Sequence, residues 1–495
     1  MPATDRPNIL WLCTDQQRHD TIAALGQPHV RTPTIDRLVG EGTAFRRAYV
    51  QSQICTPSRA SFLTGRYPAS HHVHRNGNRC FPSGETLVTR LLADAGYDCG
   101  LVGKLHLSRA QGHEVRPPND GYRVFQWSHH PLPDLDYSHH AYHRWLAEEK
   151  GVDAEALYAR VRGAVCEGVP AELHQTTWAA EMAIRFITER REGPWCLSWN
   201  PFDPHPPFDP PAEYMARYDP ESLPHPLFRD SDIERQRAFA EVAQQSIQAI
   251  DPRIPVDREQ PDDALGTAAA TRPPARFYGR AVKAAYYAMI ELLDDQIARI
   301  LDALEATGQR ERTIVVFTSD HGEMLGDHGL IYKGSRFFEG LVHVPLVVSW
   351  PGEVRAGAVS DALVESIDIA PTLLEAAGLP VPSYMQGRSL LALLRGEGML
   401  HEHRPHVVAE FNDALGSTVR PMPTHATMYF DGRYKSIVYH GMGLGELFDL
   451  ASDPGEFDNL WDRSDARDLR NTMLARHFDA MMATSTAGIE RTHRY

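Results

Sequence analysis

Short, continuous apolar runs recur through the first 350 residues, and longer amphipathic segments separate them. The runs with the pattern of buried strands are residues 8–13, 97–102, 195–199, 313–317 and 344–350. The segments with the helical spacing of apolar positions are residues 32–41, 85–95, 176–192, 280–307 and 367–377. Strands that are apolar on both faces are typical of a parallel sheet covered by helices on both sides. The alternation predicts an α/β fold with a large, mostly parallel sheet sandwiched by helices.

The pattern changes after about residue 380, where short strand-like segments replace this alternation. Residues 426–430 and 434–439 flank Asp431 and Gly432, which is a strong signal for a β-hairpin. We therefore predict two units: a large α/β domain over residues 1–380 and a smaller, antiparallel α+β subdomain over residues 381–495.

Two stretches of the first unit are less regular. Residues 108–175 are rich in proline, histidine and aromatic side chains, but the histidine spacings match no closed set of metal ligands. Residues 206–275 are rich in proline and contain one helical pattern, near residues 232–250. We interpret both stretches as insertions that lie near a pocket and build part of its wall.

Polar side chains follow four of the predicted buried strands. They are Asp15 and Gln16, then Lys104 and His106, then His205, and then Asp320 and His321, with Lys333 further along the chain. A single Asp after a strand is more often a helix N-cap, and a Lys-x-His pair alone is more often part of a surface turn. Because ligands of open α/β sheets bind at the carboxyl ends of the strands, the recurrence favours one shared site at that edge.

A possible nucleophile lies in residues 53–66, where a loop turns into a short helix. Pro57 suits the first helical turn, so Cys55 falls at the positive end of the helix beside unpaired backbone N–H groups. Arg59 lies four residues later, returns to the same face and adds a permanent positive charge. A lone cysteine at such a place is usually a small buried hydrophobe. The alternative is an anion site that contains a sulfur atom.

Composition and charge narrow the class of partner. The chain has 495 residues, of which 42% are hydrophobic and 23% charged, as in an ordinary globular enzyme. Its net charge of −15 argues against nucleic acid or an anionic membrane as a partner, so an anion site has to be a local positive pocket. The apolar run at residues 9–13 is too short for a signal peptide or a membrane span, and the six cysteines are scattered. We therefore expect a cytoplasmic protein with reduced thiols.

The cysteine segment carries a family resemblance. Cys-x-Pro-x-Arg followed by Ala-Ser-Phe-Leu-Thr-Gly-Arg resembles the signature of the type I sulfatases of the alkaline phosphatase superfamily, and the likeness extends from Pro7 to about Leu460. The resemblance is to arylsulfatases and choline sulfatases, and it implies an alkaline-phosphatase-like fold and a small-molecule sulfate ester as substrate. It also implies that a maturase oxidises Cys55 to formylglycine, an aldehyde that hydrates to a geminal diol. A homo-oligomer is compatible with this assignment.

The resemblance also implies a metal site. Sulfatases place paired ligands after two strands, which correspond to Asp15 with Gln16 and Asp320 with His321, and the modified residue 55 completes the set. Oxygen-rich ligands favour Ca²⁺. The amide and the imidazole depart from the more oxygen-rich set of many members, so Mn²⁺ and Zn²⁺ stay open.

The roles of the remaining residues follow from the same resemblance. Lys104 and Lys333 would face the sulfate oxygens, and Arg59 with the metal would hold the hydrated formylglycine. Asp320 would take the proton of the attacking hydroxyl, and His205 would protonate the leaving group beside Lys333. In the second step the sulfated diol collapses to the aldehyde, with His106 as the base.

Two other classes stay open. Phosphonate monoester or phosphodiester hydrolases use the same nucleophile, but phosphonate monoester hydrolases replace the Lys-x-His pair by uncharged hydroxyl residues. The intact Lys104 and His106 therefore favour sulfate monoesters. In a non-catalytic, sulfate-binding relative, Cys55 would stay a thiol.

Overall fold

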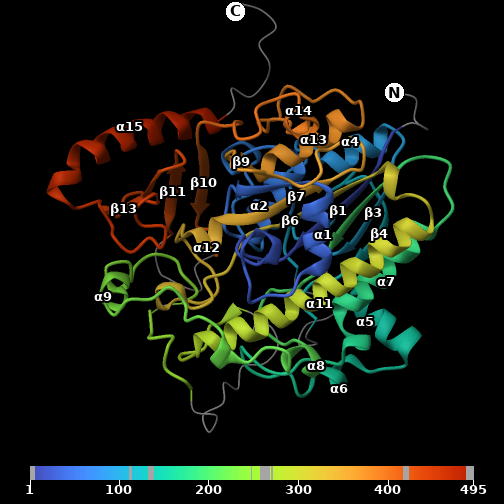
Figure 1. Cartoon of the computed structure of the whole chain (residues 1–495), viewed down its shortest axis with the longest axis horizontal. Helices are drawn as coiled ribbons and strands as arrows, with labels where there is room; N and C mark the ends of the chain where they lie inside the picture. Colours follow the sequence, from blue (N-terminus) through green and yellow to red (C-terminus); the bar gives the residue numbers. More distant parts are fainter. Residues whose placement is uncertain are drawn as a thin grey trace, which may run out of the picture.

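A computed structural model describes residues 6–110, 114–131, 139–246, 248–256, 268, 271–415 and 423–485. In the described residues a nine-stranded sheet has the order β4-β3-β5-β1-β6-β7-β2-β8, with β9 beside β2 (Figure 1). Its strands in that order are β4 Tyr122–Trp127, β3 Asp98–Gly103, β5 Trp195–Asn200, β1 Asn8–Thr14, β6 Thr313–Ser319, β7 His343–Ser349, β2 Thr43–Tyr49, β8 Ala358–Ser360 and β9 Val364–Glu365.

The four central strands of this sheet, β3, β5, β1 and β6, are parallel neighbours. Leu12 of β1 pairs with Trp199 of β5 on one side and Phe317 of β6 on the other, so the three strands end at the same level. β7 is antiparallel to β6, and β2 is antiparallel to β7. The mostly parallel sheet is thus confirmed, and the carboxyl ends of four adjacent strands meet at one edge.

Helices cover both faces of the main sheet (Figure 1), which explains the continuous apolar runs. Trp11 faces the helices α2 Cys55–Thr64, α4 Val88–Asp94, α13 Ile369–Ala376 and α14 Leu391–Arg395. Leu10 and Leu12 face α1 Pro33–Glu41, α7 Gln175–Thr188 and α11 Gly279–Ala306. Burying each such leucine contributes about 1.5–3 kcal/mol, so a one-residue slip of β1 would be costly on both faces.

A second, antiparallel sheet has the order β10-β11-β12-β13. Its strands are β10 Val407–Asn412, β11 His425–Phe430, β12 Tyr434–Tyr439 and β13 Leu444–Asp449. The hairpin expected around Asp431 and Gly432 joins β11 to β12 and is confirmed. Helix α15, Arg467–Thr484, covers the outer face of this sheet, where Met473 packs with Tyr429 and Leu447 (Figure 1).

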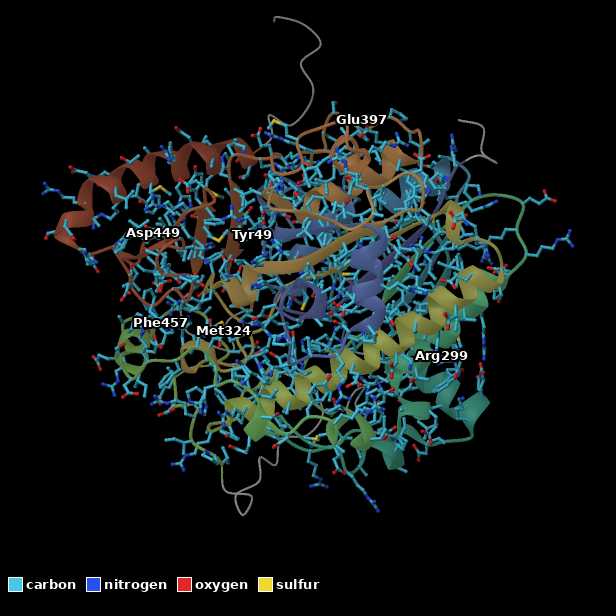
Figure 2. All side chains as sticks on the ribbon, viewed as in Figure 1. Tyr49, Arg299, Met324, Glu397, Asp449 and Phe457 are labelled. Atoms are coloured by element: carbon cyan, nitrogen blue, oxygen red, sulfur yellow. The ribbon has the colours of Figure 1, made fainter. Side chains whose placement is uncertain are left out.

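The two sheets are packed together. Tyr49 at the end of β2 lies between them (Figure 2), and its ring centroid is 5.4 Å from that of Phe430 on β11. The predicted division at residue 380 stays a prediction. The shorter helices are α3 Pro68–His71, α5 Ala141–Trp145, α6 Ala154–Tyr158, α8 Ala212–Met215, α9 Ser231–Arg237 and α12 Glu339–Val342.

Two expectations about local structure were wrong, and one strand was not predicted. Residues 108–175 are more than a surface insertion, because β4 extends the main sheet at its edge; the exposed Arg123 interrupts its apolar pattern. Strand β2 was missed for the same reason, because Arg46 and Arg47 lie in its middle. The helix expected near residues 232–250 ends at Arg237, and Gln244 forms an antiparallel bridge with Gly334 instead. No helix in the described part of the chain is long and apolar enough to cross a membrane.

Candidate active site

The order of the central strands brings the predicted residues together. Asp15 follows β1, Asp320 follows β6, Lys104 follows β3, and His205 lies in the segment after β5. Because these strands are adjacent and parallel, four segments that are far apart in the sequence meet at one edge of the sheet. All the predicted site residues are buried.

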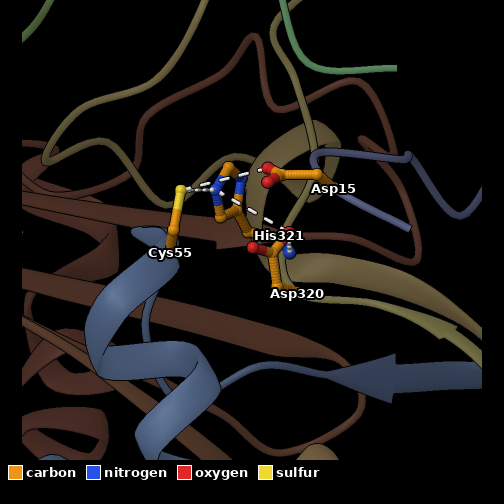
Figure 3. Close-up of side chains that lie close together, drawn as sticks. All are labelled: Asp15, Cys55, Asp320 and His321. Carbon is orange, nitrogen blue, oxygen red and sulfur yellow. Dashed lines mark hydrogen bonds and ion pairs between the residues drawn. The ribbon is translucent and has the colours of Figure 1, made fainter. Parts of the chain in front are cut away.

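Cys55 is the first residue of α2, and every residue of this helix is buried. Its Sγ lies 3.1 Å from His321 Nε2 and 4.0 Å from Asp15 Oδ1 (Figure 3). It also lies 3.2 Å from Lys333 Nζ. Burial alone would raise the pKa of the thiol, but the positive charges of Lys104 and Lys333 hold it well below its usual value. The site therefore stabilises a negative charge at position 55.

Arg59 lies beneath the two carboxylates rather than in front of them. Its Nε donates to Asp320 Oδ2 at 2.8 Å, its Nη2 to Asp15 Oδ2 at 3.4 Å, and its Nη1 to the carbonyl of Lys104 at 3.0 Å. The pKa of Asp320 is lowered, because Arg59 and His321 outweigh the effect of burial. Burial and the charge of Asp320 raise the pKa of Asp15 to about 6. Arg59 thus orients the carboxylates, and its contact with substrate stays a prediction.

Four side chains form a group that fits a divalent cation. One ligand atom from each of Asp15, Cys55, Asp320 and His321 lies within 4.8 Å of the others (Figure 3). His321 Nδ1 is 2.9 Å from the carbonyl of Gly322, which only accepts, so Nδ1 donates there and Nε2 is the nitrogen that can bind a metal when the imidazole is neutral. This second hydrogen bond is usual for a metal-ligating histidine. The donor set of carboxylates, sulfur and imidazole suits a metal ion.

Gln16 lies beside this group, with both ends of its amide in use. Its Nε2 donates to Glu323, and its Oε1 accepts from Lys333 Nζ at 2.7 Å. Its role as a metal ligand therefore stays a prediction.

Lys104 and His106 form one wall of the site. Lys104 Nζ forms an ion pair with Asp15 and lies 5.2 Å from the ring centroid of Phe202. The ring of His106 meets His129 edge-on, with the centroids 4.7 Å apart. Burial and the charge of Lys104 lower the pKa of His106 to about 4, so its imidazole is neutral and able to accept a proton.

Lys333 and His205 form the opposite wall. Lys333 Nζ lies 3.1 Å from His205 Nε2 and 3.3 Å from His321 Nε2. His205 Nδ1 lies 2.8 Å from the carbonyl of Pro206, so it is the protonated nitrogen and Nε2 accepts from Lys333. Burial and Lys333 hold the pKa of His205 well below its usual value. The lysine and the histidine are thus arranged to share a proton.

Three residues of the site were not predicted from the sequence. Glu323 follows the predicted ligands at 320 and 321, so its position was a usable signal. Phe202 lies between β5 and His205, with its ring centroid 4.5 Å from that of His205. Glu114 accepts the backbone N–H of His106 at 2.7 Å, and no pattern in its irregular segment pointed to it.

Comparisons with known proteins show which family the chain belongs to. A family model described as sulfatase matches residues 7–379. A second, described as N-sulphoglucosamine sulphohydrolase, C-terminal, matches residues 326–482.

Relatives match nearly the whole chain. An arylsulfatase of Clostridium perfringens is 28% identical over 471 residues, which are 92% of this chain and 90% of that protein. The multifunctional alkaline phosphatase superfamily protein PehA of Trinickia caryophylli is 31% identical over 496 residues, covering 92% and 91%. The crystal structure of a phosphonate monoester hydrolase of Agrobacterium radiobacter matches with a TM-score of 0.79 and 26% identity, over 97% of this chain and 96% of that one. The chain belongs to the sulfatase family and is a sulfuric ester hydrolase.

Proposed function

We propose that this enzyme hydrolyses small sulfate monoesters to an alcohol or phenol and inorganic sulfate, with a formylglycine derived from Cys55 as nucleophile. One observation carries the proposal: the buried Cys55 at the start of α2 lies among two carboxylates, His321 and two lysines. A sulfate ester presents anionic oxygens that need neutralisation, a sulfur atom that needs an aligned nucleophile, and a leaving oxygen that needs a proton. Each requirement has a candidate at this site.

The cofactors would supply two kinds of chemistry. A divalent cation at Asp15, Asp320 and His321, with Gln16 as a further candidate, would add positive charge beside residue 55 and the sulfate oxygens. Ca²⁺ is our first choice, with Mn²⁺ and Zn²⁺ as alternatives. Hydrated formylglycine would supply one hydroxyl for attack and a second for product release.

The side chains of this chain then have separate roles in the reaction. Lys104 and Lys333 bind the sulfate oxygens, while Arg59 keeps the two carboxylates in place. Asp320 accepts a proton from the attacking hydroxyl. His205 donates a proton to the leaving oxygen and draws on the adjacent Lys333 Nζ, which is 3.1 Å away. His106, neutral at pH 7, serves as the base of the second step.

Maturation and location belong to the same proposal. Cys55 is buried in the folded chain, so a formylglycine-generating maturase would have to reach it before folding is complete. A cytoplasmic location is supported by the six cysteines, all within the described residues, which are thiols rather than disulfides.

Mass spectrometry of the peptide that carries Cys55, combined with rates on a panel of aryl and alkyl sulfates, tests the proposal. We expect formylglycine in active preparations, and only trace turnover after Cys55→Ser, because a serine cannot form the hydrate. A highly active preparation whose Cys55 is fully alkylatable would overturn the assignment.

A second function is favoured by the likeness to the Agrobacterium radiobacter phosphonate monoester hydrolase. The same site would then act on phosphonate monoesters or phosphodiesters. Lys104 and His106 favour sulfate monoesters over phosphonate monoesters as substrates. Side-by-side kcat/KM values on an aryl sulfate and an aryl phosphonate decide between the two functions.

A further inference from the structure

The loop after β3 is held by one buried carboxylate. Glu114 accepts the backbone N–H of His106 at 2.7 Å, of Leu107 at 2.5 Å and of Ser108 at 3.3 Å. Its Oε2 also accepts the indole N–H of Trp127 at 3.0 Å. Glu114 is 6% exposed, so three consecutive backbone donors and one side-chain donor converge on a carboxylate inside the protein.

This carboxylate replaces the support that a sheet would give. β3 ends at Gly103, and residue 106 has a φ of 57°, a left-handed conformation that is uncommon for residues other than glycine. Buried backbone N–H groups need acceptors, and in this loop Glu114 supplies them. Ser108 closes the loop further, because its Oγ exchanges hydrogen bonds of 3.1 Å with both the N–H and the carbonyl of Val115.

The side chain of His106 has few partners of its own. It forms a hydrogen bond with Cys55, but its Nδ1 is buried without a hydrogen-bond partner among the described residues, and its ring meets His129 only edge-on. The place of the imidazole therefore depends on the backbone that carries it. A backbone held by three hydrogen bonds to one side chain depends in turn on that side chain.

We propose that Glu114 is a positioning residue, which holds His106 in place for the second step of the reaction. The inference rests on the proposed function, in which His106 is the base of that step. An ionised carboxylate accepts all four hydrogen bonds with its two oxygens. An amide of the same shape places an NH₂ group against at least one backbone N–H, and the loop has to move. A displacement of about 1 Å at a reacting group costs about 10²-fold in rate.

Glu114→Gln, compared with Glu410→Gln, tests the proposal. Glu410 is a matched control, because it is a carboxylate with the same 6% exposure that accepts the N–H of Ala69 at 2.8 Å and the amide of Asn412 at 2.7 Å. We expect Glu114→Gln to lower kcat by up to about 10²-fold, with a burst of released alcohol before slow turnover, because the alcohol leaves in the first step and a displaced His106 slows only the second. Glu410→Gln should show no burst. Equal kcat values in the two variants, or a loss in Glu114→Gln without a burst, would overturn the proposal.

Amide hydrogen exchange gives a readout that does not depend on activity. In Glu114→Gln the amides of residues 106–108 should exchange faster than in the parent protein, while those of β3 stay protected. One outcome is that the parent protein hydrolyses no sulfate ester while exchange at residues 106–108 still rises in Glu114→Gln. In that case the proposed function is wrong, but the conclusion that Glu114 fixes the loop is kept. Unchanged amide exchange at residues 106–108 in Glu114→Gln would contradict the proposal itself. If Glu114→Gln does not fold, Trp127→Phe removes one donor and keeps the carboxylate; it should give a smaller rise at 106–108, and no rise counts against the proposal.

Discussion

The floor and the walls of the site are built in different ways. The floor consists of Arg59, from α2, with Asp15 and Asp320, whose backbone continues the sheet: Asp320 N–H donates to the carbonyl of Thr14 at 3.3 Å, and Asp15 N–H to that of Asp203 at 3.1 Å. The walls consist of Lys104 and His106 on one side, and His205 and Lys333 on the other. His106, His205 and Lys333 lie on irregular segments beyond the strand ends.

The wall that carries Lys333 is held by side chains from distant parts of the chain. In the segment that carries Lys333, the backbone N–H of Lys333 donates to Gln245 Oε1 at 3.1 Å. Further along the same segment, the carbonyl of Phe337 accepts from Lys435 Nζ at 2.9 Å. Arg336, in the same segment, forms a buried ion pair with Glu446 of β13. The small C-terminal sheet thus supports a wall of the site without reaching its centre.

This difference separates two kinds of failure. A change in the floor disturbs the carboxylates, the metal group and residue 55 together, because they share hydrogen bonds. A change in a wall should affect one chemical step, or one class of substrate, and leave the others. The following variants test that separation.

The largest effect is expected from Asp320→Asn in the floor. It keeps the shape but removes the charge that pairs with Arg59 and contributes to the metal group, so metal and activity should be lost together, by more than about 10²-fold in rate. Elemental analysis and turnover of the same sample check this. Asp294→Asn is the control, because Asp294 is a buried carboxylate that accepts the N–H groups of Thr34 and Ile35, at 2.9 and 2.8 Å, outside the site. Active Asp320→Asn enzyme without stoichiometric metal would refute the metal assignment.

His205→Ala, in a wall, should have an effect whose size depends on the substrate. A general acid matters most when the leaving oxygen is basic, so alkyl sulfates should lose about 10²–10⁴-fold and nitrophenyl sulfate much less. A series of sulfates with leaving groups of different pKa measures this. An equal loss across the series would mean that His205 binds substrate rather than donating a proton.

Glu446→Gln, in the C-terminal sheet, should have the smallest effect on rate. Arg336 would stay buried with its partner neutralised, and removing one partner of a buried ion pair costs about 3–5 kcal/mol of stability. Turnover well below the melting temperature should fall by only about 10-fold, because Lys333 shifts but keeps its charge. Urea unfolding and the leaving-group series are measured together. Asp368→Asn is the control, since it weakens another buried ion pair, with Arg404, and should leave the leaving-group dependence unchanged. Identical kinetics in the two variants would show that the C-terminal sheet does not position Lys333.

The sequence alone determined the alternation of buried strands and helices, the hairpin at residues 426–439, and Cys55 at a helix start. These are local properties, because a strand buried on both faces has to be apolar throughout and a helix start has few suitable residues. Strands β2 and β4 could not be recognised from the sequence. Arg46 and Arg47 interrupt the apolar run of β2, and Arg123 interrupts that of β4, because these strands are in contact with solvent there.

Tertiary structure alone decided which strand ends are neighbours and what holds the segments beyond them. The order β3-β5-β1-β6 places residues 15, 104, 205 and 320 at one edge. The positions of the strands along the sequence do not reveal that order. Glu114 and Glu446 could not be recognised from any sequence pattern. The role of a single buried carboxylate depends on the hydrogen-bond donors that surround it in the folded chain. The chemistry of the floor was therefore predictable from short motifs, and the support of its walls depended on contacts that only the folded chain makes.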